Sequence, residues 1–178
     1  YFNFYDLPFL SINGKWESSN IPFTEKLYQK SINHSAGFDI SGAYSFDSNT
    51  KMITAKINST ALFDASNYSL QMAIIEKQTI KNAKTNGETV FRKVVKKMLP
   101  NETGSLLKNY KDGDRDSITF SFQFMGDYRL PNGYALANAI DFTKEHSVED
   151  FANLEVVAWI QGVGTEIQQA INLTKINT

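Results

Sequence analysis

Histidine and cysteine are scarce in this chain, which limits the acid–base chemistry that it could perform. The sequence has no cysteine and only two histidines, His34 and His146. Neither belongs to a pattern that would bring an imidazole within hydrogen-bond reach of a nucleophile, as a Ser-His-Asp arrangement requires. Both are interpreted as surface histidines. The sequence therefore predicts no catalytic residue, no cofactor and no enzyme activity.

An acidic run offers a candidate cation site. Asp112, Asp114 and Asp116 stand at alternate positions, as at the start of a calcium-binding loop. The continuation does not fit, because Ser117 stands where such a loop needs glycine and Gln123 where it needs a bidentate glutamate. The preferred interpretation is an aspartate-rich turn that leads into a strand, with no metal, and calcium binding is the alternative.

Four basic residues lie close together in one predicted strand. Arg92, Lys93, Lys96 and Lys97 place positive charge on both of its faces, where they could meet an anionic lipid headgroup or a polysaccharide. The alternative is that these lysines protect an exposed sheet edge from pairing with another chain. The edge interpretation is favoured because lysine commonly serves this purpose.

Trp159 is the aromatic residue with the clearest potential for binding. It lies on the opposite side of its predicted strand from the apolar residues Val156, Ala158 and Ile160. An indole that faces water there could stack on a sugar ring or anchor a protein partner. If a long side chain of a neighbouring strand covers it, Trp159 is cross-strand packing instead, and this is the favoured interpretation.

Alternation of apolar and polar residues predicts the strands that carry these side chains. The clearest example is the run Ile118, Phe120, Phe122 and Phe124. Turn residues separate the segments, and the last two are joined as a hairpin through residues 162–165. Together they predict a seven-stranded antiparallel sandwich of immunoglobulin-like type. The seven segments are residues 38–46, 52–57, 68–76, 90–99, 118–124, 154–161 and 166–173.

Residues 1–36 have a different pattern, and we place a domain boundary between residues 36 and 37. Residues 6–16 predict a strand closed by the Asn13-Gly14 hairpin turn. A short amphipathic helix is expected after Pro22, ending near His34. The sequence thus predicts a hairpin-plus-helix unit, followed by one sandwich domain over residues 37–178.

Composition narrows the functional class. Eighteen basic and nineteen acidic residues leave a formal net charge of −1, which excludes the electrostatic footprint of a nucleic-acid binder. Apolar runs are only a few residues long, far short of the roughly 20 that span a bilayer. Aromatic residues make up 13% of the chain, which favours strands over helices.

Four segments of the sequence resemble the outer-membrane-protein-28-related family of Bacteroidetes envelope proteins. They are residues 67–76 (NYSLQMAIIE), 91–100 (FRKVVKKMLP), 153–161 (NLEVVAWIQ) and 164–170 (GTEIQQA). The resemblance implies an immunoglobulin-like sandwich preceded by a thioredoxin-like domain. Residues 5–16 resemble the last third of a thioredoxin fold, and Pro8 then corresponds to its cis-proline. The front half of that fold, with any Cys-x-x-Cys motif, is missing from this sequence, so no redox activity is implied for it.

Taken together, the sequence predicts a non-catalytic binding or spacer module of a bacterial outer-membrane lipoprotein or a secreted protein. Its expected partner is a protein or glycan at the cell surface, and not a nucleic acid. A homodimer through residues 1–36 is also expected, because such a remnant leaves a strand edge and an apolar helix face to be covered. The alternative function is an accessory domain of a thioredoxin-like thiol-disulfide protein.

Overall fold

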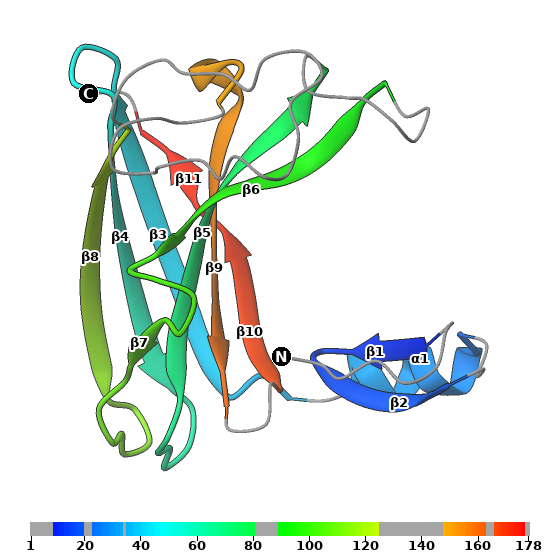
Figure 1. The fold of residues 1–178 in the computed structure, drawn as a ribbon. Coiled ribbons are helices and arrows are strands. Elements are labelled where there is room, and N and C mark those ends of the chain that lie inside the picture. The colour runs from blue at the N-terminus through cyan, green and yellow to red at the C-terminus, as the bar shows by residue number, and fades with distance from the viewer. Residues whose placement is uncertain are drawn as a thin grey trace.

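The computed structural model describes residues 9–19, 23–33, 35–80, 89–124, 148–162 and 166–176. Within these ranges the chain is mainly β, as predicted, with one α-helix. Figure 1 shows long, upright strands that form the larger part of the molecule, with a small hairpin and helix at one side. Residues Pro8, Pro22, His34 and His146, on which several expectations rest, lie outside the described residues.

The first of the two larger sheets, here called the β3 sheet, has the strand order β11-β3-β4-β8. Its three long strands pair antiparallel without irregularity, so alternate residues share one face throughout. Along β8 this puts Ile118, Phe120 and Phe122 on the inner face, opposite Ile57, Ala55 and Ile53 of β4. The strands are β3 (Phe38–Asp47), β4 (Met52–Ala61), β8 (Arg115–Gln123) and β11 (Thr174–Lys175).

The second sheet, here called the β5 sheet, has the strand order β10-β9-β5-β6, and the short β7 also pairs with β5. Its central strand β5 is buried continuously from Leu70 to Glu76, unlike the alternating strands of the β3 sheet. Apolar residues therefore occupy both faces of this strand. The strands are β5 (Ser69–Thr79), β6 (Phe91–Leu99), β7 (Ser105–Leu106), β9 (Leu154–Gln161) and β10 (Ile167–Asn172).

The inner faces of the two sheets share one core. Phe38 and Ile53 from the β3 sheet and Met72, Ile74 and Ile160 from the β5 sheet are all completely buried. A polar contact also joins the sheets, because the hydroxyl of Tyr44 donates to the carbonyl oxygen of Leu154 at 2.8 Å. Burial, and next the negative charge of Glu155, raise the pKa of Tyr44. The hydroxyl therefore stays protonated and keeps this hydrogen bond.

The end of the described chain contributes to both sheets. β10 belongs to the β5 sheet, and after Leu173 the chain crosses to the β3 sheet, where β11 pairs parallel with β3. Leu173 is 6% exposed and its N–H donates to Val156 at 2.9 Å. Gly42 makes room for this crossing, since a Cβ there would lie 2.7 Å from the Lys56 carbonyl and 3.2 Å from Leu173.

Among the described residues, nine strands make up the two larger sheets, where the sequence predicted seven. The seven expected segments all form strands, and the additional ones are β7 and β11. Each of these has only two residues, which is too short for a periodic pattern. Just before β9, Asp150 caps the short 3₁₀-helix η1 (Phe151–Asn153) by accepting from the N–H of Ala152.

The N-terminal unit contains β1 (Phe9–Ile12), β2 (Lys15–Ser19) and α1 (Glu25–Ile32). The predicted hairpin is confirmed: β1 and β2 are antiparallel, and Asn13 and Gly14 both have positive φ. These strands pair with neither of the larger sheets. None of the helices in the described ranges has the length and apolar character of a membrane span.

Helix α1 begins at Glu25, two residues later than a start directly after Pro22. Thr24 is its N-cap, and its side chain accepts from the N–H of Leu27 at 3.3 Å. No residue of this helix is buried. Phe23 and Ile32 remain 61% and 53% exposed.

Candidate functional site

Trp159 lies on β9, on the face of the β5 sheet that points away from the shared core. Its sequence neighbours Ala158 and Ile160 point inward and are 1% and 0% exposed, whereas Trp159 is half-buried. Across the ladders, Trp159 is paired with Ala170 of β10 and Gln71 of β5. Because paired residues share a face, these two are the direct cross-strand neighbours of the indole.

Neither neighbour is a long side chain that is free to cover the indole. Ala170 ends at its methyl group. The side chain of Gln71 is held by the adjacent loop, because its Nε2 donates to the Thr103 carbonyl at 3.0 Å. The indole N–H of Trp159 donates to Oε1 of Gln161 at 3.2 Å. Cross-strand packing, favoured from the sequence, and ligand stacking both stay predictions for Trp159.

Two adjoining hollows open on this side of the molecule, and we call them together the Trp159 groove. The first, of about 450 Å³, is mainly apolar, and the second, of about 250 Å³, lies between β10 and the N-terminal unit. They share Ile167 and Ala170. The first is also lined by Val157, Trp159, Ile171 and Asn172, and the second by Asn13, Ala36, Gln168 and Gln169.

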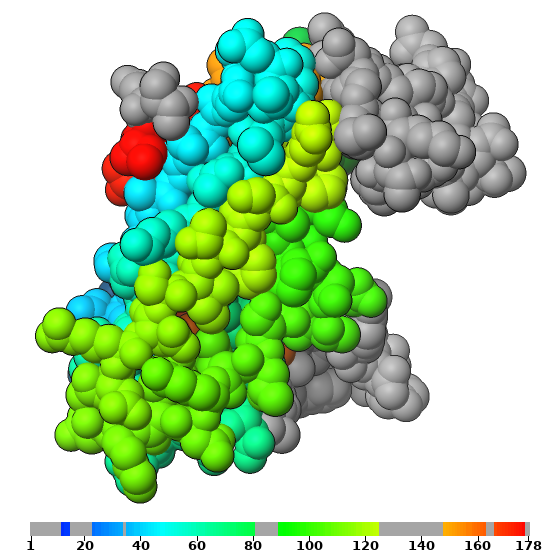
Figure 2. Space-filling view, turned by 90° about the vertical axis from the view of Figure 1, so that its left-hand side faces the viewer, coloured from blue at the N-terminus to red at the C-terminus, as the bar shows by residue number. Residues whose placement is uncertain are grey.

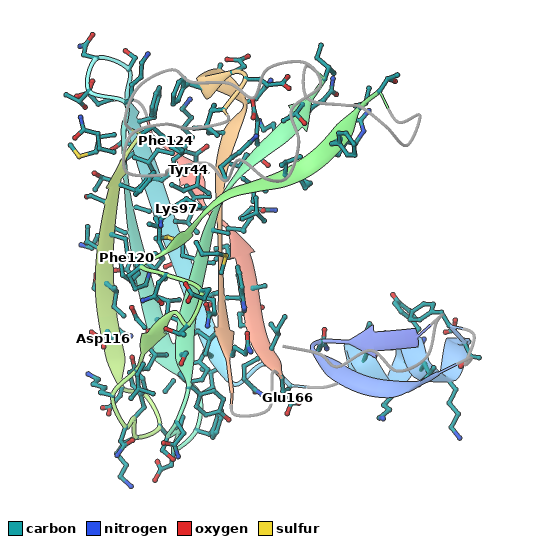
Figure 3. All side chains as sticks on the ribbon, viewed as in Figure 1. Tyr44, Lys97, Asp116, Phe120, Phe124 and Glu166 are labelled. Carbon is teal, nitrogen blue, oxygen red and sulfur yellow. The ribbon has the colours of Figure 1, made fainter. Side chains whose placement is uncertain are left out.

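A β-bulge shapes the junction of the two hollows. The register between β9 and β10 shifts between Ile167 and Gln169, so Gln168 is the extra residue. Such a bulge bends its strand and redirects the side chains beside it. Next to the bulge, the N–H of Ile167 donates to the carbonyl oxygen of Asn13 at 2.8 Å, which joins β10 to the turn of the N-terminal hairpin. Figure 3 shows Glu166 at the end of β10 near this unit.

The basic residues of β6 do not form one surface. Lys96 is the extra residue of a second β-bulge, opposite the step from Ile74 to Ile75. The bulge directs the Lys96 side chain inward, where it is 4% exposed and its Nζ lies 3.0 Å from Oε2 of Glu76. Lys96 was a candidate for binding an external partner, as the alternative to the favoured edge interpretation, and its buried side chain does not fit that alternative.

The other three basic side chains of β6 point to separate contacts. Lys93 has a positive φ and contacts Glu155 at 2.6 Å, where Lys77 approaches at 3.4 Å. Burial raises the pKa of Glu155, but hydrogen bonds and charge from Lys93 and Lys77 outweigh it and leave that pKa lowered. A guanidinium nitrogen of Arg92 donates to Gln78 at 3.2 Å.

Lys97 lies where the edges of the two sheets meet. Its ammonium group lies 5.4 Å from the centre of the Phe122 ring of β8, within the range of a cation–π contact. Figure 2 shows β6 in green beside β8 in yellow-green on this side of the molecule. Since β6 is the edge strand of the β5 sheet, its arrangement fits the edge interpretation better than a basic binding patch.

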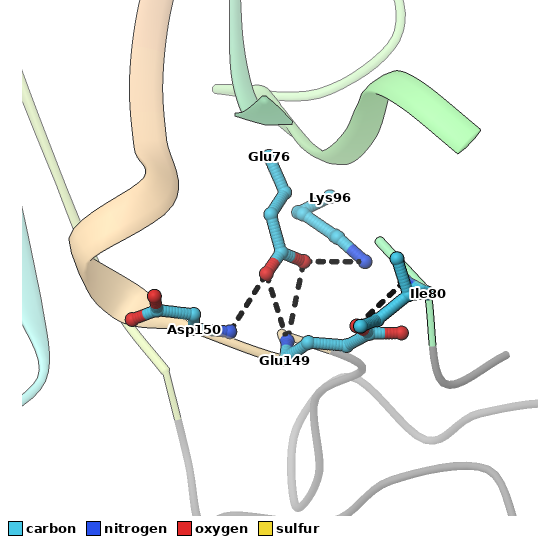
Figure 4. A network of polar contacts seen from close by, with 5 residues as sticks. All are labelled: Glu76, Ile80, Lys96, Glu149 and Asp150. Atoms are coloured by element: carbon cyan, nitrogen blue, oxygen red, sulfur yellow. Dashed lines mark hydrogen bonds and ion pairs between the residues drawn. The ribbon is translucent and has the colours of Figure 1, made fainter. Parts of the chain in front are cut away.

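Glu76 is the centre of the polar cluster that holds Lys96 (Figure 4). Its carboxylate is completely buried, and its Oε1 accepts from the backbone N–H groups of Glu149 and Asp150 at 3.0 and 2.7 Å. Glu149 in turn accepts from the N–H of Ile80 at 2.8 Å. The cluster therefore ties residues 148–150 to β5 and β6, and its polar groups are used in these contacts.

The three aspartates of the candidate calcium loop are not brought together around one point. Asp114 accepts from the N–H of Lys111 at 2.8 Å, and Asp116 accepts from the Tyr110 hydroxyl at 3.1 Å. Asp112 donates its own N–H to Asp64 at 3.1 Å. In the part of the chain that the structure describes, no three histidine, aspartate or glutamate residues are grouped as metal ligands. The arrangement is that of the predicted turn.

No family model, curated protein or solved structure matches this chain.

The sequence interpretation missed two features of the site, and one of them had a detectable signal. Glu76 continues the inward series Leu70, Met72 and Ile74 on β5, so a buried carboxylate that needs a partner could have been expected. The second feature is the hollow between β10 and the N-terminal unit, and no pattern in the sequence indicated it. It depends on the bulge at Gln168 and on the position of the Asn13 turn, which follow from tertiary contacts.

Proposed function

We propose that this chain is a non-catalytic binding module of a cell-envelope or secreted protein, with the Trp159 groove as its recognition surface. The observation that carries the proposal is the half-buried Trp159, which faces an open groove beside the small residue Ala170. Exposed aromatic residues in concave, largely apolar surfaces are common anchors for ligands and protein partners. The first hollow also falls within the volume range of about 300–1,000 Å³ that is usual for small-molecule sites.

The immunoglobulin-like architecture is part of this proposal. Seven strands of six or more residues in two facing, largely antiparallel sheets support it, with β7 and β11 as short additions. Such modules often serve to bind or to space other domains, although the fold alone does not fix a function. The envelope location is supported by the resemblance of residues 67–76, 91–100, 153–161 and 164–170 to an envelope family.

A non-catalytic role is supported by how the buried titratable groups are used. Glu76 and Lys96 contact each other, Glu76 also accepts from the backbone of residues 149 and 150, and neither lines a hollow of the groove. Around the indole, the polar side chains Gln161 and Asn172 carry amides, which do not exchange protons near neutral pH. These features suit recognition better than acid–base chemistry.

Thermal unfolding in the presence of three ligand classes tests this function. The panel contains neutral oligosaccharides, anionic oligosaccharides and short peptides. One class should raise the Tm, because a ligand at 100 times its Kd stabilises a folded protein by about 2.7 kcal/mol. The Trp159→Ala variant should lose this shift. An arginine–lysine double variant, Arg92→Ala/Lys93→Ala, is the matched control and should keep it. A shift that survives in Trp159→Ala and disappears in the control would move the site from the groove to β6.

The cellular location is tested separately, by fractionation of the native host. Recovery of the protein with the outer membrane or in the medium is the expected result. Recovery in the cytosol would contradict the envelope proposal.

The homodimer through residues 1–36 stays a prediction. Exposed Phe23 and Ile32 on and beside helix α1 are the surface that it would cover. Sedimentation equilibrium should then give twice the monomer mass, and Ile32→Glu should return the mass to that of the monomer. A wild-type protein that sediments as a monomer at high micromolar concentration would contradict it.

A further inference from the structure

We infer that the Trp159 groove binds a neutral oligosaccharide, with one sugar ring on the indole and the next against the amides at the N-terminal hairpin. The inference rests on the proposed binding function and adds to it the chemical class of the ligand. It also gives the N-terminal unit a part in recognition, through Asn13.

The absence of charge in the groove is the first reason. None of the described residues that line its two hollows is charged. Two other surface hollows differ, because one is lined by Arg115 and Asp116 and the other by Asp64 and Lys111. An anionic or cationic ligand in the groove would lose water without gaining a charged partner. The lining therefore matches an uncharged ligand.

The arrangement of apolar and amide surface is the second reason. The hollow at Trp159 is mainly apolar, and the adjoining one is mainly polar and is lined by Asn13, Gln168 and Gln169. A sugar ring has an apolar face that can stack on an indole, while its hydroxyl groups both donate and accept hydrogen bonds. Asparagine and glutamine amides also do both, and so they complement hydroxyl groups better than a charged side chain does.

The side chains that line the groove are held in place before a ligand arrives. The indole N–H of Trp159 is bound by Gln161 at 3.2 Å, which fixes the ring on the sheet. Oε1 of Gln169 accepts from the N–H of Ala170 at 3.0 Å, which leaves its NH₂ group as a donor for a ligand. The backbone bond from Ile167 to Asn13 keeps the hairpin turn next to β10. Such preorganisation reduces the entropy that binding loses.

Fluorescence of Trp159 provides a direct test. The chain has two tryptophans, so the full chain carrying Trp16→Phe reports on Trp159 alone. This protein is titrated with neutral hexasaccharides of glucose, mannose and N-acetylglucosamine, with hexagalacturonate as the anionic comparison, and with uncharged extended hexapeptides. At least one neutral hexasaccharide should change the emission, and hexagalacturonate should bind at least about tenfold more weakly.

Two substitutions separate the subsites. Ala170→Leu fills the junction of the hollows from an exposed position and should abolish binding with an unchanged Tm. Thr119→Leu, at an exposed position of β8, is its matched control and should bind normally. Gln169→Ala removes one amide and should weaken binding about 2- to 10-fold, as expected for one lost hydrogen bond. Calorimetry of Trp159→Ala should show a loss of about 30-fold or more, typical of an aromatic anchor.

The outcomes distinguish this inference from the proposed function. An emission change with the hexapeptides but with no saccharide would overturn the ligand class and leave the groove as a binding site. Equal binding of hexagalacturonate and the neutral hexasaccharides would overturn the charge argument. If no ligand changes the emission and Trp159→Ala alters no Tm shift, both the ligand class and the groove as recognition surface are wrong.

Discussion

Two regions of the β5 sheet contrast in charge and in access. The cluster of Glu76 and Lys96 is charged, buried and bonded to backbone groups, whereas the Trp159 groove is uncharged, open and lined by apolar side chains and amides. From the sequence, the charged strand and the tryptophan were both binding candidates. The structure shows that the lysine nearest the middle of β6 belongs to the interior. The ion pair of Glu76 and Lys96 is therefore an internal contact of this sheet, and the Trp159 groove is neutral, although Lys93 and Glu155 carry charge elsewhere on its surface.

The largest expected effect is the loss of the buried ion pair. Lys96→Met leaves the carboxylate of Glu76 buried without its cation, which typically lowers the free energy of unfolding by about 3–5 kcal/mol. Lys97→Met, one residue away, removes only a contact with the partly exposed ring of Phe122 and should lower it by under about 1 kcal/mol. Urea denaturation measures both. Equal losses of stability in the two variants would contradict the distinction between a buried ion pair at Lys96 and a surface charge at Lys97.

A second pair of variants compares the inner and outer faces of β9 at two adjacent positions. Ile160→Ala creates a cavity in the shared core and should lower the free energy of unfolding by about 2–5 kcal/mol. Trp159→Ala removes a larger side chain from the open face and should have less than half that effect. The measurement is chemical denaturation of both variants in one buffer. A Trp159→Ala variant that is less stable than Ile160→Ala would show that the indole is mainly structural.

The smallest expected effect concerns the surface carboxylate between Lys93 and Lys77. The pKa of Glu155 is lowered, so its stabilising contribution is present above the ordinary value of 4.5 and disappears as the pH falls through the lower folded-state pKa. Wild type should therefore exceed Glu155→Gln in stability at pH 7, by under about 1 kcal/mol because the lysines are exposed. This difference should vanish near pH 2. A difference that persists there would mean that Glu155 acts through packing instead of charge.

Local patterns in the sequence predicted most of the strands, because each is long enough to show a period of two. Ile118 to Phe124 and Leu154 to Gln161 alternate between an inner and an outer face, and the structure places them so. The Asn13-Gly14 turn was equally local, since both residues tolerate positive φ. The strands β7 and β11 were missed because two-residue strands depend on their partners and not on their own pattern.

The site was predicted less well, because bulges decide where its side chains point. One inserted residue in β6 turns Lys96 to the interior, and one in β10 forms the junction at Gln168. A bulge changes the phase of the alternation without a distinctive residue type, so a pattern of period two assigns the wrong face beyond it. Trp159 was placed on the correct face because β9 itself runs without a bulge against β5.

The crossing at Leu173 affects how the module responds to mechanical force. β11 lies parallel to β3, with Thr174 opposite Ala43, and Ile176 is bonded to the carbonyl of Tyr44. A pull on the chain before β3 and after β11 acts along these two strands in opposite directions. Their hydrogen bonds are then loaded together in shear, and are not broken one after another as in an unzipping hairpin. Under such a pull, separation of β11 from β3 requires these hydrogen bonds to break together.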